Sequence, residues 1–476
     1  MVFASLTFIF LVLPLFWTLD FIFKKKIFLR NFALCAVSLF FYVFGGGTHC
    51  LKILIAYGVL NYIFGLILER QKSSTSSKKE LYQKLLLITF VGCNLLALFF
   101  YKYAYWLISS FETMVLGFTN DEVTVSPKML PLGISFFTFH AISYLIDISR
   151  GELSGKNKVL SFLTYFFMFP HLVAGPIVRF KQVREDLETR TPNSSLFTYG
   201  MYRFLLGFNK KILIANTVSV FPDMAFTYNI ESISMGNSWL GAIGYALQIY
   251  FDFSAYSDMA IGLAAMAGFR FEENFNQPYL TKSIREFWRR WHISLSSWLR
   301  DYLYIPLGGS RVRTSRIYLN LITVFFFCGL WHGANMTFVI WGLYNGLFII
   351  LERLYLAKFF DKLPTIFSHI YAIIVILVGW VFFRAENLPQ ALDYISIMFG
   401  AQNFSNPFIN DIEILNYVAM AIGIFVVFSK FKSFNSSNSH EHETHTIAFV
   451  VNAVLAFFSV AMLFNGSANP FIYFNF

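Results

Sequence analysis

The sequence predicts an all-α polytopic membrane protein, and two observations support this: its composition and the spacing of its apolar runs. Of its 476 residues, 57% are hydrophobic and only 13% are charged. Apolar runs recur from Phe3 to the C-terminus, and many are long enough to cross a hydrocarbon layer about 30 Å thick. No soluble domain, internal repeat or interdomain linker interrupts them, so we expect a single integral-membrane domain over residues 1–476.

Charge and cysteine usage exclude other classes of protein. The net charge is +10, but excess Lys and Arg in a membrane protein mark cytoplasmic loops, so we expect the lipid bilayer and no nucleic acid as a partner. The 4 cysteines lie in or beside apolar runs without metal-ligand spacing, which predicts no metal site. The first run, 2–23, lacks a basic start and a cleavage site, so we expect it to be retained as a span.

The basic clusters predict the topology. Those at 24–30 and 70–79 are separated by two apolar runs, so both are expected inside and the N-terminus outside. The run 160–178 has basic clusters at both ends and contains FPHLVAGPI. Broken backbone at membrane depth is tolerated only where protein or a water-filled cavity covers it, so this segment is predicted to re-enter rather than span.

Two further segments do not have the pattern of simple spans. Segment 198–220 carries Lys210 and Lys211 in its middle, and segment 281–310 mixes Trp and Leu with many basic residues. Both patterns are typical of amphipathic helices, and we expect them at the cytoplasmic interface.

The apolar stretch 317–352 contains a histidine. One helix over this stretch would be about 54 Å long at about 1.5 Å per residue, which is too long for a single span. We therefore expect two helices that turn near Gly333, which places His332 deep in the membrane.

Seven motifs occur in order along most of the chain. They are PLGISFFTFHAISYLIDISRG (131–151), FPHLVAGPIVR (169–179), LQIYFDFSAYSDMA (247–260), ENFNQPY (273–279), REFWRRWHISLSSWLRDYLYIPLGG (285–309), LWHG (330–333) and the terminal FIYF. Together they resemble the membrane-bound O-acyltransferase family, and within it the bacterial branch of the alginate and peptidoglycan O-acetyltransferases. Ala255 stands where glycine is expected in that branch, a small change that leaves the expected activity intact.

The resemblance implies a fold and two catalytic residues. The fold would have about eleven or twelve transmembrane helices plus re-entrant and interfacial helices, with a core over about 130–350. Cytoplasmic and outer funnels would join near His332, which matches the family's invariant histidine, while His292 matches its second characteristic polar position. A buried imidazole favours its neutral form and can take a proton from an attacking hydroxyl. Each histidine also has a structural alternative to a catalytic role. His332 could be a helix-turn residue bonded to a carbonyl, and His292 could be a residue that positions a helix.

Three polar residues of an apolar run are supporting candidates. Carboxylates such as Asp252 and Asp258 at membrane depth usually face a protein interior or a pathway and have partners. With Gln248 they could orient a histidine, or the carboxylates could hold Arg289 or Arg290. A structural ion pair is an equal alternative.

Basic residues near the predicted cytoplasmic face could bind the phosphates of an acyl-coenzyme A donor. The alternative is that they anchor the chain in the anionic leaflet. The donor-binding candidates are Arg179, Lys210, Lys211, Arg289 and Arg290.

The C-terminal NPFIYFNF is predicted on the outer side. In the branch named above, such a tail could fold back into the outer funnel, where the Tyr473 hydroxyl could accept an acetyl group and pass it on. The alternative is an interfacial aromatic anchor.

The resemblance therefore predicts a multi-pass O-acetyltransferase of the inner (cytoplasmic) membrane. Acetyl-CoA would be a substrate, with no bound cofactor, and acetyl would cross the membrane for O-acetylation of an exported polysaccharide of the peptidoglycan or alginate type. A periplasmic SGNH-hydrolase-like transferase is the implied partner. Two rivals remain: a transporter or flippase that moves an acyl carrier or glycan without chemistry, and a scaffold that only recruits the periplasmic transferase.

Overall fold

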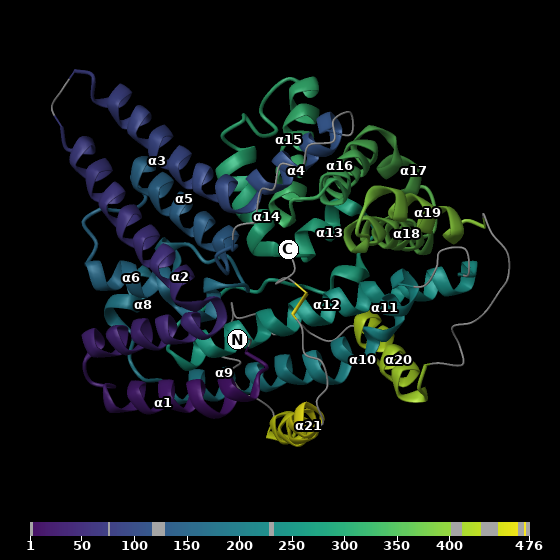
Figure 1. Cartoon of the computed structure of the whole chain (residues 1–476), viewed down its shortest axis with the longest axis horizontal. Coiled ribbons are helices and arrows are strands. Elements are labelled where there is room, and N and C mark those ends of the chain that lie inside the picture. The colour runs from purple at the N-terminus through teal and green to yellow at the C-terminus, as the bar shows by residue number, and fades with distance from the viewer. Residues whose placement is uncertain are drawn as a thin grey trace. The chain divides into compact units, whose positions relative to one another are not determined.

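A computed structural model describes residues 3–74, 77–116, 129–227, 233–400, 412–429, 446–464 and 471–472. Every regular element in these ranges is helical and none is a strand, which confirms the all-α prediction (Figure 1). The chain divides into two compact units, each described by itself. The first comprises Met1–Arg203 and Ala260–Glu272, and the second comprises Phe204–Met259 and Glu273–Phe476.

The first unit holds the N-terminal helices. They are the π-helical turn η1 (Phe8–Val12), α1 (Leu13–Ile22), α2 (Ile27–Lys72), α3 (Lys79–Lys102), α4 (Ala104–Leu116), α5 (Ile134–Arg150), α6 (Val159–Phe167), α7 (Phe169–Leu172) and α8 (Phe180–Thr189). The residues of α9 (Ser194–Asn209) and α12 (Met235–Met266) are divided between the units.

The second unit holds the remaining elements. They are η2 (Lys210–Ala215), α10 (Asn216–Val218), α11 (Val220–Thr227), η4 (Pro278–Leu280), α13 (Ile284–Arg290), α14 (Ile293–Leu299), η5 (Arg300–Tyr304), α15 (Thr314–His332), α16 (Met336–Leu351), η6 (Glu352–Leu356), α17 (Ala357–Phe360), α18 (Thr365–Arg384), α19 (Leu388–Met398), α20 (Ile414–Phe428) and α21 (Thr446–Phe464).

Seven helical runs within the described ranges are long and apolar enough to cross a membrane. The longest, α2, is broken at Gly47, whose φ of 75° and ψ of 174° lie outside helical geometry, and the two apolar runs of the sequence predicted this division. The expected total of about eleven or twelve spans stays a prediction. The seven runs are Ile27–Lys72, Lys79–Lys102, Ser194–Thr227, Thr314–His332, Met336–Phe360, Thr365–Arg384 and Thr446–Phe464.

The segment 160–178 is broken, as its prolines and glycine predicted. Helix α6 has 9 residues, about 14 Å at about 1.5 Å per residue, which is too short to cross a membrane. Met168 ends it with a φ of −58° and a ψ of 123°, and α7 has only 4 residues. A continuous span is thereby excluded, and re-entry stays a prediction.

The segment 198–220 differs from its prediction. It lies within Ser194–Thr227, a continuous helical run of 34 residues with the length and apolarity of a span, so the expectation that it fails as one is wrong. Lys210 and Lys211 are tolerated in this run because each forms an ion pair with an aspartate of α12.

The segment 281–310 forms only short helices. Helices α13 and α14 have 7 residues each and η5 has 5, so none of them can span a membrane. This confirms that the segment is not a simple span, and its place at the interface stays a prediction.

Helices α15 and α16 form the predicted hairpin, which turns at residues 333–335 (Figure 1). Gly329 and Gly342 let the two backbones approach closely. A Cβ at Gly329 would overlap the Phe338 carbonyl, and a Cβ at Gly342 would overlap the Phe325 carbonyl. Small residues are the usual solution for close helix contacts in membranes. This hairpin positions His332.

Candidate active site

His332 is the last residue of α15 and is 3% exposed. The chain leaves the helix at Gly333, where a Cβ would overlap the Phe338 ring unless that ring moved, so the present packing favours glycine. Helix α16 then begins after Asn335, whose side-chain oxygen accepts a hydrogen bond from the Thr337 N–H at 3.1 Å. The His332 imidazole therefore lies at the C-terminal end of α15, directly before the turn to α16.

Three aromatic rings surround the His332 imidazole. The ring centroids of Trp331, Trp341 and Phe383 lie 4.9, 5.0 and 5.1 Å from it, with interplanar angles of 78°, 89° and 74°. Trp341 in turn stacks on Trp380 of α18 at 5.8 Å. Edge-to-face contacts of this kind fix the orientation of the imidazole in an apolar setting, where a proton-transfer group acts with little competition from water.

His292 precedes α14 and is fully buried. Its φ of 43° and ψ of 55° are left-handed, a conformation uncommon for a non-glycine residue. Its Nδ1 lies 3.2 Å from Asn274 Oδ1, and the Phe253 ring contacts it edge-on at 4.7 Å. Burial lowers the pKa of His292 to about 3, so this imidazole is neutral at physiological pH. Both histidine rings contact Trp331, since its indole lies 6.1 Å from His292.

A basic cavity of about 1090 Å³ lies beside the α15–α16 hairpin. It reaches Cys328, which precedes His332 by about one helical turn. Glu352 and Asp361 are its acidic lining residues. Its basic lining residues are Lys282, Arg285, Arg289, Arg300, Arg353 and Lys358. The cavity is therefore strongly positive.

Glu352 fixes one wall of the basic cavity. Its carboxylate accepts hydrogen bonds from the Ile284 N–H at 2.6 Å, the Arg285 N–H at 3.1 Å and the Tyr371 hydroxyl at 3.2 Å. The two N–H groups belong to the first turn of α13, where a carboxylate satisfies backbone donors and complements the helix dipole. Glu352 thereby ties α13, which carries Arg289, to the end of α16.

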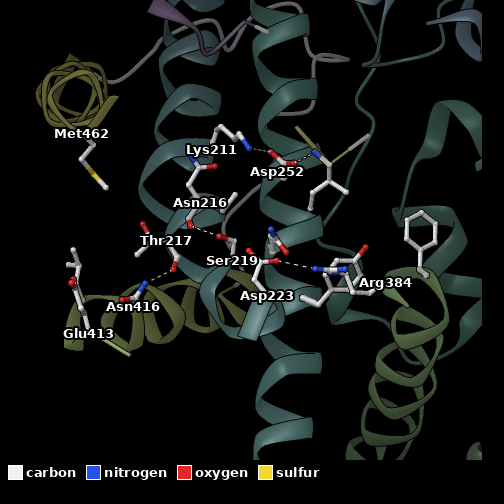
Figure 2. Close-up of a pocket in the computed structure, with 16 residues that line it drawn as sticks. Lys211, Asn216, Thr217, Ser219, Asp223, Asp252, Arg384, Glu413, Asn416 and Met462 are labelled. Atoms are coloured by element: carbon white, nitrogen blue, oxygen red, sulfur yellow. Dashed lines mark hydrogen bonds and ion pairs between the residues drawn. The ribbon is translucent and has the colours of Figure 1, made fainter. Parts of the chain in front are cut away.

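A second cavity, of about 510 Å³, is polar, and its charges are largely paired. Figure 2 shows the ion pairs of Lys211 with Asp252 at 2.7 Å and of Arg384 with Asp223 at 3.1 Å. Near the C-terminus, the backbone N–H of Ile472 donates to Asp252 Oδ2 at 2.8 Å. The polar cavity therefore differs from the basic cavity in having little net charge.

Gln248 and Tyr245 also line the polar cavity. Within the part of the chain that the structure describes, Gln248 Oε1 and the Tyr245 hydroxyl are buried without a hydrogen-bond partner. Phe383 is a third lining residue, and it brings the polar cavity to the side of the His332 ring. The predicted relay residue Tyr473 lies outside the described residues.

The predicted carboxylates have partners that the sequence did not indicate. Asp252 and Asp258 form ion pairs with Lys211 and Lys210, each at 2.7 Å, whereas the sequence had suggested Arg289 or Arg290 as possible partners. The alternative of a structural ion pair therefore describes both carboxylates, and a catalytic role stays a prediction.

Four of the five donor-binding candidates belong to the second unit, where they are not gathered at one place. Arg289 lines the basic cavity, whereas Lys211 lines the polar one. Arg290 forms an ion pair with Glu286 inside α13 at 2.8 Å. Arg179 belongs to the first unit, at the start of α8.

Sequence reasoning missed Glu352 and Asn274. Glu352 is a carboxylate at the end of the apolar stretch 317–352, a signal similar to that of the two aspartates, but the sequence pattern assigned it no role. Asn274 lies in the ENFNQPY motif, whose individual side chains had no assigned role.

A buried histidine beside a positively charged cavity and a polar one is an arrangement suited to group transfer between two substrates. Residues 135–388, which include both histidines, match the family model MBOAT, membrane-bound O-acyltransferase family. The chain belongs to this family and is a multi-pass membrane O-acyltransferase. A transporter without chemistry and a pure scaffold are thereby set aside.

Named relatives cover most of the chain. "Probable alginate O-acetylase AlgI" of Pseudomonas putida is 41% identical over 403 residues, which are 84% of this chain and 80% of the relative. The peptidoglycan O-acetyltransferase of Helicobacter pylori is 34% identical over 402 residues, which are 78% and 74% of the two chains. The teichoic acid D-alanyltransferase of Streptococcus thermophilus is 27% identical over 364 residues, which are 71% of this chain and 80% of the relative.

Proposed function

We propose that the protein takes acetyl from cytoplasmic acetyl-CoA and moves it across the cytoplasmic membrane for O-acetylation of an exported polysaccharide of the alginate or peptidoglycan type. The observation that carries the proposal is the position of His332. The basic cavity reaches Cys328, one turn before it, and the polar cavity reaches Phe383, whose ring contacts it. Relatives named for O-acetylation of alginate and of peptidoglycan support acetyl as the transferred group.

The charge and size of the basic cavity suit acetyl-CoA. Coenzyme A carries several phosphate groups, which Arg and Lys bind through charge-assisted hydrogen bonds. A volume of about 1090 Å³ lies just above the roughly 300–1,000 Å³ of ordinary small-molecule sites, as a large donor requires. Arg289 is the sequence-predicted candidate for phosphate binding, and the thioester would extend past Cys328 toward His332.

His332 acts as the general base. Its imidazole takes the proton of an acceptor hydroxyl while the oxygen forms a bond to the acetyl carbonyl carbon. The carbon–sulfur bond then breaks, and the coenzyme A thiolate takes the proton from the imidazolium to leave as the thiol. His292 assists either by orienting a reacting group or by stabilising the oxyanion.

The polar cavity receives the hydroxyl acceptor. The Gln248 and Tyr245 groups that lack partners within the described ranges can bond to an incoming hydroxyl. Tyr473 is our candidate for the first acceptor, because Ile472, the residue before it, already bonds to Asp252 in this cavity. The Tyr473 ester would then pass its acetyl group on. A serine of the partner is the other candidate acceptor.

The charge asymmetry supports an orientation in the membrane. Excess basic residues favour the cytoplasmic side, so the basic cavity would open to the cytoplasm and the polar cavity to the outside. A periplasmic SGNH-hydrolase-like transferase would collect the acetyl group there and place it on the glycan.

The test is His332→Ala in cells, with exposed His49→Ala as the matched control. We expect the first variant to lose O-acetylation at normal membrane levels and the second to keep it. Unchanged acetylation in His332→Ala would contradict the proposal. Separate O-acetyl assays of the cell wall and of exported polysaccharide in a deletion strain identify the acceptor.

A further inference from the structure

We propose that Asn274 is a positioning residue that fixes the tautomer of His292, so that the imidazole carries its proton on Nδ1 and presents Nε2 as a hydrogen-bond acceptor. This inference rests on the proposed function, because it decides between the two roles that His292 could take there. The tautomer itself can be measured without any assay of acetyl transfer.

The Asn274 amide is oriented by a backbone group. Its Oδ1 accepts hydrogen bonds from the Ser294 N–H at 3.1 Å and from the Ser294 hydroxyl at 2.8 Å. A backbone N–H can only donate, so the atom that faces it must be the amide oxygen rather than the amide nitrogen. The same oxygen lies 3.2 Å from His292 Nδ1 and can only accept. The Nδ1 atom must therefore carry the proton.

Backbone bonds on both sides hold this arrangement in place. The Ile293 N–H donates to the Asn274 carbonyl at 2.9 Å, and the Asn276 N–H donates to the Arg290 carbonyl, also at 2.9 Å. These bonds bracket His292, whose left-handed φ of 43° is kept because the segments before and after it are pinned. The edge-on Phe253 ring, 4.7 Å away, limits rotation of the imidazole.

The fixed tautomer restricts the chemistry of His292. A neutral imidazole has one ring proton, so with Nδ1 protonated the Nε2 atom can accept a hydrogen bond but cannot donate one. An oxyanion needs donors, and complete burial opposes the imidazolium that would have two. His292 therefore orients a hydroxyl or another N–H or O–H donor, and oxyanion stabilisation must come from other groups.

The direct test is NMR of the full-length protein labelled with ¹³C,¹⁵N-histidine in lipid. The His292 signals are assigned by their loss in His292→Gln, and correlations to the ring carbons show which nitrogen bears the proton. We expect the Nδ1–H form in the wild-type protein and in Asn274→Asp, which keeps an acceptor oxygen. In Asn274→Leu, which has no acceptor, we expect a mixture of tautomers. An Nε2–H wild-type ring, or an unchanged Nδ1–H ring in Asn274→Leu, would overturn the inference.

Kinetics separate positioning from loss of structure. Asn274→Leu should lower kcat by about 10- to 100-fold with little change in the KM for acetyl-CoA, and Asn274→Asp should recover most of kcat. The control is Asn276→Ala, which keeps the backbone bond to Arg290. Equal activity of Asn274→Leu and the wild type would contradict a positioning role. If His332→Ala kept its activity, the proposed function would fail while the tautomer measurement still stood.

Discussion

The phenyl ring of Phe383 lies against the imidazole of His332, with ring centroids 5.1 Å apart and planes inclined by 74°. The same phenyl ring lines the polar cavity. Phe383 is 2% exposed, so its side chain is buried and closely packed. Phe383 therefore lies between the polar cavity and the imidazole.

Phe383→Ala should let water reach His332 from the polar cavity. We expect hydrolysis of acetyl-CoA by the purified protein, measured as coenzyme A release without a partner, to rise by about 10-fold because the site no longer excludes water. The neighbouring Phe382→Ala is the control, since its ring contacts Tyr344 at 5.8 Å instead. Equal hydrolysis by both variants would show that Phe383 does not shield the histidine.

Gly329→Ala should separate α15 from α16. Its new Cβ would overlap the Phe338 carbonyl, and backbone overlap of this kind costs about 2 kcal/mol or more. We expect a lower unfolding temperature in detergent and a loss of activity, since His332 ends the displaced helix. Gly92→Ala in α3 is a matched control because its Cβ would meet nothing within 4 Å. If both variants unfolded at the same temperature, the close approach would not matter.

Arg289→Ala should weaken donor binding. Loss of one charge-assisted contact to phosphate costs about 1.5–3 kcal/mol, so the KM for acetyl-CoA should rise by about 10-fold or more at low salt, with a smaller change in kcat. Arg290→Ala is the comparison, because that side chain forms its ion pair with Glu286. A larger KM effect in Arg290→Ala would reverse our assignment.

Lys211→Met should destabilise the protein through the aspartate that it leaves behind. The two side chains are 5% and 2% exposed, and an uncompensated buried charge costs about 3–5 kcal/mol. We expect a marked fall in unfolding temperature that the double variant Lys211→Met/Asp252→Leu partly reverses. A double variant less stable than Lys211→Met would mean that Asp252 has a further indispensable partner.

Stability should fall on mild acidification because of His292. Its folded pKa of about 3 lies below the usual value near 6.5, so between these values the unfolded chain binds more protons than the folded one. Folding is then weakened as pH drops from about 6.5, by at most about 1.4 kcal/mol per pH unit. The unfolding temperature of His292→Gln should change less between pH 7.5 and pH 5 than that of the wild type. Parallel pH curves would contradict the assignment.

The hairpin could be predicted from the sequence because it depends on local quantities. Length, apolarity and a glycine after His332 were sufficient to expect two helices and their turn. The span-length helical run 194–227 was missed, because the charges of Lys210 and Lys211 argue against a span when this segment is considered alone. Their aspartate partners lie on another helix, and pairing between helices has no signature in either segment.

The cavities depend on side chains from several distant segments. Glu352 bonds to backbone groups of α13, and Asn274 bonds to the turn that carries His292. In the sequence, Glu352 ends an apolar stretch and Asn274 is one of several polar residues of the ENFNQPY motif, and neither pattern indicates which group it bonds to. The two candidate histidines could be named from a family pattern, whereas the groups that hold them in place could be found only from three-dimensional contacts.

The near-neutral polar cavity also matters for inhibitor design. On the proposed topology the polar cavity opens to the outside. A compound added to the medium could therefore occupy this cavity and block acetyl export without entering the cell. Because the lysine and arginine there are already matched by carboxylates, uncharged polyhydroxylated molecules are better starting points than phosphate-bearing mimics of the donor.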